Sequence, residues 1–182
     1  DGTTPRPEPP YTGTVTIGAM TFAADATQPP VSEGTVVNVT WGTDAANLSV
    51  SEKTVTLNNL PIDAWQNVNA DLTLSEACKV TLSITNNTGD VAKFKLSVMC
   101  NNDQGGWSDL EGNGTTVCWL EIPKGETWNM ELTVSASDAP KVAHIMLMVN
   151  CWASGNVVTE TGAPCPAGPY TGNIVLGDVK VS

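Results

Sequence analysis

The feature that most constrains the fold is the recurrence of short strand signals along the chain. Segments rich in Val, Thr, Ile and Leu, many with apolar and polar residues in alternation, are separated by clusters of Asn, Asp, Gly and Pro. Convincing helix signals are absent, and this spacing predicts an all-β fold, a two-sheet antiparallel β-sandwich of jelly-roll type. The predicted strands cover 13–22, 35–41, 48–57, 68–74, 78–86, 91–100, 115–122, 127–135, 142–152 and 173–181.

The 182 residues are enough for one domain with a substantial core. The first ten residues are rich in proline and resemble a semi-rigid inter-module linker, so we predict a linker remnant at 1–10 and a single β-sandwich module at 11–182. Residues 10–18 are also similar in sequence to residues 169–177, and both segments begin with Pro-Tyr-Thr-Gly. Residues 1–22 therefore either supply an edge strand to this domain or form the last strand of a preceding, similar module.

Charge limits the possible partners. The net charge is −11, the pI is about 4.2, and there are only eight Lys and Arg residues. Nucleic acid and anionic membranes are therefore not expected partners. No apolar run approaches the roughly 20 residues of a membrane span. A neutral polysaccharide, a protein or a cation is compatible with this charge, and we expect a monomer.

The tryptophan content is unusual, because six Trp stand beside two Tyr and two Phe. Side chains alternate along a strand, and in 117–122 the apolar set Cys118, Leu120 and Ile122 leaves Trp119 on the opposite face. In 144–152 the same argument places Trp152 outward, together with His144 and two methionines. Outward indoles on an acidic chain predict a ligand surface. A flat indole face matches the axial C–H face of a pyranose ring, which points to sugar binding.

The predicted ligand surface includes a third indole, Trp107, in the loop that follows the strand ending at Cys100. Stacking on an indole gives no directed hydrogen bonds to sugar hydroxyls, so nearby polar side chains are the candidates for that role. The candidate ligand-binding residues are Trp107, Trp119, Trp152, Asn150, Glu121, Met148, Asn101, Asn102, Asp103 and Gln104. The open alternative is that Trp119 and Trp152 are buried in the core. Trp41 and Trp65 are predicted to pack rather than bind.

Little in the sequence indicates catalysis. His144 is the only histidine, no GxSxG nucleophile motif is present, and the loop acids show no spacing typical of a glycosidase pair. We therefore expect a protein that is not an enzyme. A structural calcium ion is a candidate cofactor, with Asp178 and Glu33 as tentative ligands, because hard cations take carboxylate oxygens from loops. The alternative is that these acids are simply solvated.

The five cysteines show no zinc-binding spacing. An odd number leaves at least one thiol unpaired. The first interpretation is that they are small buried apolar residues, and the second is a single disulfide between Cys151 and Cys165.

The chain resembles the β-sandwich carbohydrate-binding modules of bacterial plant-cell-wall-degrading enzymes and cellulosomes. The resemblance is carried by the terminal segment 171–181 with Asp178, by the hairpin-like segment 77–98 and by the Pro-rich start. It implies a non-catalytic module that binds a β-linked glucan, mannan or xyloglucan and targets an attached catalytic module, secreted by a bacterium. It also implies an acidic residue near a structural calcium at Asp178. A structural, adhesion or protein-interaction module remains the alternative.

Overall fold

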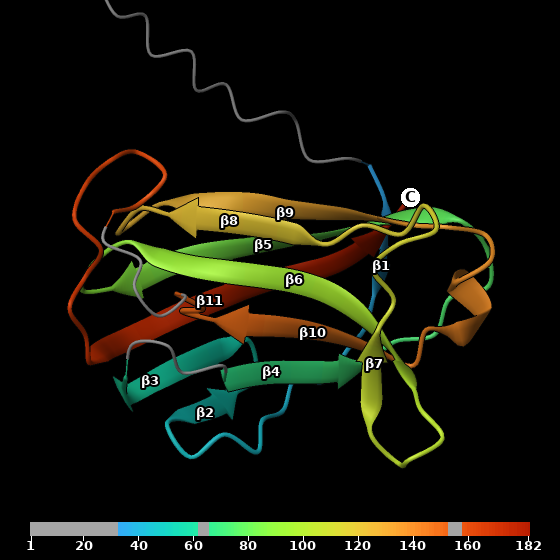
Figure 1. Ribbon diagram of the computed structural model, residues 1–182, viewed down its shortest axis with the longest axis horizontal. Coiled ribbons are helices and arrows are strands. Elements are labelled where there is room, and N and C mark those ends of the chain that lie inside the picture. Colours follow the sequence, from blue (N-terminus) through green and yellow to red (C-terminus); the bar gives the residue numbers. More distant parts are fainter. Residues whose placement is uncertain (1–32, 62–65, 153–157) are drawn as a thin grey trace, which may run out of the picture.

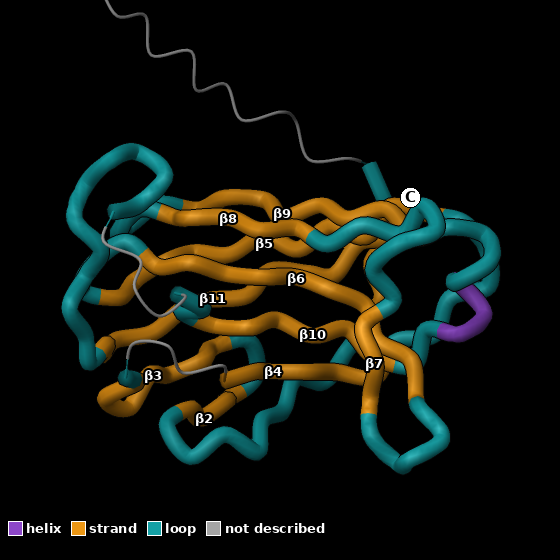
Figure 2. The backbone as a smooth tube through the Cα atoms, in the orientation of Figure 1, coloured by secondary structure: helices purple, strands orange, loops and turns teal. Residues whose placement is uncertain are grey.

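A computed structural model describes residues 33–61, 66–152 and 158–182 (Figure 1). Almost all of the regular structure is strand, with one short 3₁₀ helix at Ala139–Lys141 (Figure 2). The strands are β1 (Thr35–Val37), β2 (Leu48–Ser51), β3 (Thr54–Leu60), β4 (Gln66–Asp71), β5 (Cys78–Thr88), β6 (Ala92–Asn101), β7 (Trp107–Asp109), β8 (Cys118–Ile122), β9 (Thr127–Val134), β10 (His144–Val149) and β11 (Tyr170–Val181).

The strands form two antiparallel sheets. Sheet A has the order β2-β3-β11-β5-β9, with β1 also paired to β11. Sheet B has the order β4-β10-β6-β7, with β8 also paired to β6. From β3 onward the chain crosses repeatedly between the sheets, and β11 returns to lie between β3 and β5. This arrangement confirms the predicted two-sheet antiparallel sandwich of jelly-roll type.

The core lies between the sheets and is filled by every second residue of the long strands. Leu82 and Ile84 on β5, and Phe94 and Leu96 on β6, are completely buried. This alternation confirms the inward faces that the sequence predicts for these strands. The opposite faces of β5 and β6 carry mostly Thr, Ser, Lys and Asn, and Met99 near the end of β6 is the apolar exception.

β6 sets the geometry of the outer face of sheet B. It is ten residues long, and its first half pairs with β8 while its last three residues pair with β7. On its other side it pairs with β10, which in turn pairs with β4. Side chains from five strands are therefore collected on one outer face, and the site described below lies there.

The predicted strand at 142–152 is too long at its C-terminal end. β10 ends at Val149 because Asn150 adopts the left-handed conformation, with φ of 57°. The alternation of faces stops at that residue. The predicted strand at 13–22 lies outside the described residues, as does Trp65.

All five cysteines are free thiols, so no disulfide joins Cys151 to Cys165. Cys151 is buried, and the other four are partly buried. The interpretation of the cysteines as small packing residues therefore fits Cys151 best.

Candidate functional site

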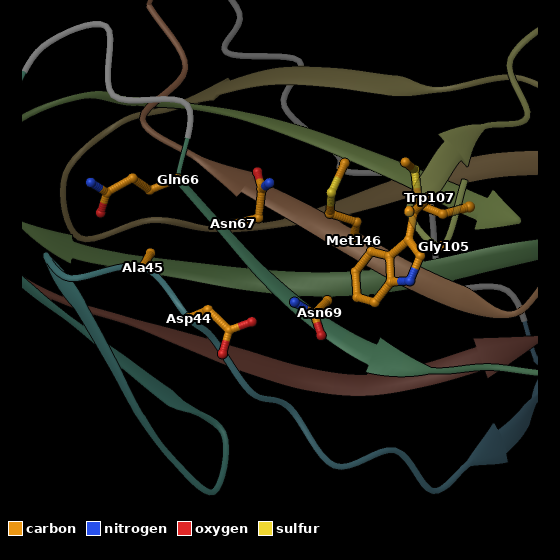
Figure 3. A pocket seen from close by; sticks show the side chains of 10 residues that line it. Asp44, Ala45, Gln66, Asn67, Asn69, Gly105, Trp107 and Met146 are labelled. Atoms are coloured by element: carbon orange, nitrogen blue, oxygen red, sulfur yellow. The ribbon is translucent and has the colours of Figure 1, made fainter. Parts of the chain in front are cut away.

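A cleft of about 770 Å³ crosses the outer face of sheet B (Figure 3). One end is formed by Asp44 and Ala45, in the loop that precedes β2, and the other by the hairpin between β6 and β7. The lining residues are Asp44, Ala45, Gln66, Asn67, Asn69, Met99, Gly105, Gly106, Trp107 and Met146. The lining thus combines an indole, two thioethers, three amides and one carboxylate.

The Asp44 end is fixed by hydrogen bonds to the edge strand β4. Gly42 and Asn69 exchange backbone hydrogen bonds of 2.8 and 2.9 Å, which extends sheet B by one bridge beyond β4. The Thr43 hydroxyl donates to the Asn67 carbonyl at 2.6 Å and accepts from the Ala45 amide at 3.0 Å. This loop is therefore tied to the strand that forms the floor of the cleft.

Trp107 forms the opposite wall, and 40 % of its surface is exposed. It begins β7, directly opposite Asn101 of β6. The indole stacks on the imidazole of His144, with ring centroids 3.9 Å apart and planes 25° apart. Figure 3 shows the ring between Met146 and Asn69, facing the cleft. An exposed but stacked indole is a rigid apolar platform.

The hairpin that carries Trp107 is organised by Asn102. Its side-chain carbonyl accepts hydrogen bonds from the amides of Gln104 and Gly106, at 3.1 and 2.9 Å, and its NH₂ group donates to Ser108. Asn102 therefore shapes the turn and does not present a free side chain to the cleft. Asp103 and Gln104 lie exposed at the tip of the hairpin.

Two amide oxygens beside the cleft have no hydrogen-bond partner. Asn67 Oδ1 and Gln66 Oε1 are both buried from solvent and unpaired, although the Gln66 NH₂ group donates to Asn47 at 3.2 Å. A buried acceptor without a donor is unfavourable by about 1–3 kcal/mol. The lining of the cleft itself combines the Asp44 carboxylate with side-chain amides, which both donate and accept hydrogen bonds. Such a lining suits a ligand rich in hydroxyl groups.

Trp119 lies on the same outer face, toward the other end of β6. It pairs with Lys95, six residues from Asn101, so the two exposed indoles lie on strand positions about 20 Å apart. The Lys95 ammonium sits 5.4 Å from the Trp119 ring centre and 2.7 Å from Asp109 of β7. Trp119 is 40 % exposed, as the alternation predicts.

Trp152 is not on this surface, and its predicted outward orientation is wrong. The left-handed Asn150 rotates the chain after β10, and Trp152 becomes completely buried, with its N–H donating to Asn150 Oδ1 at 3.0 Å. Asn150 is itself completely buried. Met148 does face outward in register with Lys95, but it is only 7 % exposed and packs in a cluster with Met99, Met146 and Cys151.

The remaining predicted ligand residues take different positions. Asn101 accepts a hydrogen bond from a ring nitrogen of His144, beside Trp107. Glu121 faces outward next to Trp119, but its carboxylate meets Lys93 at 3.5 Å and accepts from the Glu160 amide at 2.8 Å. Glu121 therefore holds the segment around residue 160 and is little exposed.

The two predicted calcium ligands, Asp178 and Glu33, have different surroundings. Asp178 makes an ion pair with Lys53, which lowers the pKa of its carboxyl through a hydrogen bond. Glu33 stands two residues before β1 and is exposed. Among the described residues, no three His, Cys, Asp or Glu side chains gather closely enough to hold a metal ion.

Sequence reasoning missed the β4 side of the cleft. Asn67, Asn69 and Asp71 alternate with Val68 and Ala70, so a polar outward face was visible in the sequence. Which strand this face adjoins was not visible, because β4 pairs with β10 more than 70 residues later. Asp44 was considered only as an acid near a calcium site, and its place in a loop gave no signal for this cleft.

Comparison with known proteins gives a likeness of fold. No protein-family model matches the chain, and no curated protein matches it. The CBM22-2 xylan-binding domain of Xyn10C from Paenibacillus barcinonensis is 12% identical, with a TM-score of 0.44, and the match covers 78% of this chain and 90% of that one.

Two further solved structures are similar. The CBM22-1–GH10 modules of Xyn10B from Clostridium thermocellum, an endo-1,4-beta-D-xylanase complexed with xylohexaose, are 11% identical, with a TM-score of 0.48 over 78% of this chain and 26% of that one. A structure described as CBM4 is 15% identical, with a TM-score of 0.44 over 77% of each chain. These structures are, or contain, carbohydrate-binding modules, the class that the sequence resembles. At this identity the likeness concerns the fold and carries no argument about a ligand.

In the described part of the chain, no helix has the length and apolar character needed to cross a membrane.

Proposed function

We propose that the protein is a non-catalytic carbohydrate-binding module that binds a neutral, β-linked polysaccharide of the glucan, mannan or xyloglucan type in the cleft on sheet B. The observation that carries the proposal is Trp107, an indole that is 40 % exposed, held rigid by a stacked ring, and set at the wall of a cleft floored by amides. Apolar platforms beside amide hydrogen-bonding groups suit a sugar ring, which has C–H faces and hydroxyl edges.

The cleft carries one negative charge and no positive one. Asp44 is the only charged residue among those that line it, beside amide side chains that both donate and accept hydrogen bonds. Hydroxyl groups can pair with such side chains, whereas the carboxylates of an acidic polysaccharide would be repelled by Asp44. The chain's net charge of −11 acts in the same direction. The proposed ligand is therefore uncharged.

The length of the polar face favours a chain over a single sugar. Trp107 and Trp119 are about 20 Å apart along β6 and both are exposed, so a polysaccharide that contacts one can extend toward the other. Trp107 is the first stacking platform in this proposal and Trp119 the second. We further propose that such a module acts outside the bacterial cell as part of a longer protein, where it raises the concentration of an attached catalytic module on the polysaccharide.

The alternative of a structural spacer predicts that Trp119 and Trp152 are both buried, and only Trp152 is. The alternative of a protein-binding methionine stripe needs exposed thioethers, but Met99, Met146 and Met148 are each at most 8 % exposed. Neither alternative accounts for the cleft, so a second function is not proposed.

Native affinity electrophoresis tests the proposal. The protein is run through gels that contain xyloglucan, mixed-linkage β-glucan, glucomannan, galactomannan, xylan or pectin, with an inert protein of similar charge as the mobility reference. Retardation by a neutral polysaccharide supports the proposal. In a separate incubation of the protein with each polysaccharide, release of reducing sugar would contradict the non-catalytic part. Retardation by pectin alone, or by no polysaccharide, would overturn it.

A further inference from the structure

Trp107 is held by contacts that cross three strands of sheet B. Its indole stacks on His144 of β10 at 3.9 Å, and β6 lies between these two strands, with Met99 paired directly to His144. The His144 side chain is only 14 % exposed, whereas Trp107 is 40 % exposed. The stack therefore covers one part of the indole and leaves the rest open to the cleft.

Both ring nitrogens of His144 face oxygen atoms. Nδ1 lies 3.0 Å from Asp71 Oδ1 on β4, and Nε2 lies 3.1 Å from Asn101 Oδ1 at the end of β6. An imidazolium donates from both nitrogens and satisfies both oxygens. A neutral imidazole donates from one nitrogen only, so its second nitrogen faces an oxygen unless Asn101 turns its amide group.

The charged groups around the ring come from neighbouring strands. Asp71 is the carboxylate in contact with His144, and its side chain is almost fully exposed, so salt screens this pair. On β7, Asp109 pairs with Met99 in the strand ladder, and its carboxylate is 2.7 Å from the Lys95 ammonium of β6, which balances its charge. A protonated His144 also places a positive charge against the face of Trp107, which is attractive.

Resting on the function proposed above, we infer that Asp71, Asn101 and His144 are positioning residues for the Trp107 platform, and that protonation of His144 tightens the platform so that ligand binding in the cleft strengthens as the pH falls. Histidine is the side chain that changes charge between about pH 5 and 8. The site would thus bind its polysaccharide more strongly in mildly acidic surroundings. The gain in affinity is at most about two- to five-fold, because only the part of the cation–indole attraction that differs between the free and the ligand-bound protein contributes.

The first test needs no ligand, because it observes the stack of Trp107 on His144 directly. His144 is the only histidine in the chain, so a change caused by histidine protonation can be assigned to it. Tryptophan fluorescence is recorded between pH 8 and pH 5.5 for the wild type and for Trp107→Phe, His144→Phe and Trp119→Phe. A protonated imidazole quenches a stacked indole, so the wild type and Trp119→Phe should lose emission on acidification, while Trp107→Phe and His144→Phe should not. A wild type without this change, or a Trp107→Phe variant that keeps it, would overturn the inference.

The second test measures affinity for a neutral polysaccharide that retards the wild type. We expect His144→Ala to bind the polysaccharide more weakly than the wild type at both pH 8 and pH 5.5. His144→Phe keeps a stacking ring, so it should bind like the wild type but with an affinity that does not change with pH. Equal binding by His144→Ala and the wild type at both pH values would show that His144 does not position the platform. If no neutral polysaccharide binds, the proposed function fails, and the fluorescence result still decides whether His144 holds Trp107.

Discussion

Removing the Trp107 indole should weaken polysaccharide binding without unfolding the domain. Trp107 exposes 40 % of its surface. A fully covered aromatic side chain buries about 150–250 Å², so a sugar that covers the exposed part of Trp107 removes about 60–100 Å² from water. At about 25 cal/mol per Å², this area contributes about 1.5–2.5 kcal/mol to binding. Trp107→Ala should therefore raise the Kd roughly 10- to 70-fold.

Isothermal titration calorimetry with a soluble oligosaccharide of the bound polysaccharide measures this loss. Val175→Ala is the matched control, because Val175 is 37 % exposed on the outer face of the opposite sheet. Thermal unfolding monitors the fold. Trp107→Ala should lower the free energy of unfolding by about 2–4 kcal/mol, because about 90–150 Å² of the indole is already covered, with up to about 1.5 kcal/mol more from the aromatic pair. A folded Trp107→Ala variant with a Kd within two-fold of the wild type (a difference of about 0.4 kcal/mol) would refute the reasoning.

Three further predictions concern stability and thiol chemistry. Asn86 is completely buried and donates to the carbonyls of Ile122 and Asp90 at 2.8 and 2.9 Å, so Asn86→Ala should lower the free energy of unfolding by about 3 kcal/mol, and a loss under about 1 kcal/mol in urea unfolding would contradict this. A hydrogen bond from Lys141 lowers the pKa of the Asp138 carboxyl from its ordinary value of 3.8, so this group stabilises the fold above that value and the stabilisation is lost as the pH falls through the lowered pKa. Asp138→Asn should therefore be less stable at pH 6 and show a smaller further loss on acidification, measured by urea midpoints from pH 6 to pH 2; an unchanged profile would count against it. Burial raises the pKa of the Cys151 thiol to about 12, so iodoacetamide at pH 8 should leave it unmodified in the folded protein, and its alkylation without unfolding, seen by mass spectrometry, would be the contrary result.

The sandwich was predictable because its long strands obey a period of two. On β5, on β9 and on the first half of β6 the inward apolar set and the outward polar set separate cleanly, as for Leu82 against Ser83. The same rule correctly placed Trp119 outward. The rule failed for Trp152 because Asn150 adopts the left-handed backbone conformation and ends the alternation of faces. The alternation of apolar and polar residues in the sequence does not show where such a conformation occurs.

The candidate site was only partly predictable, because it depends on pairings that are distant in the chain. Trp107 was identified from the excess of indoles, but its stacking on His144 requires β7 and β10 to lie on either side of β6. Likewise, Asn67 and Asn69 become cleft residues only because β4 is the neighbour of β10. Local pattern shows which face of a strand is polar, and the sheet order decides which polar faces meet.

The central claim, that a neutral polysaccharide binds across the outer face of sheet B, is tested most directly by the indole N–H signals in a ¹⁵N–¹H spectrum. The six tryptophans give six such signals, to be assigned by single Trp→Phe variants. On addition of a soluble oligosaccharide from a retarding polysaccharide, the signal of Trp107 should move most and that of Trp119 should follow, while those of the buried Trp41 and Trp152 stay in place. Saturating ligand that leaves the Trp107 signal unmoved would contradict the account.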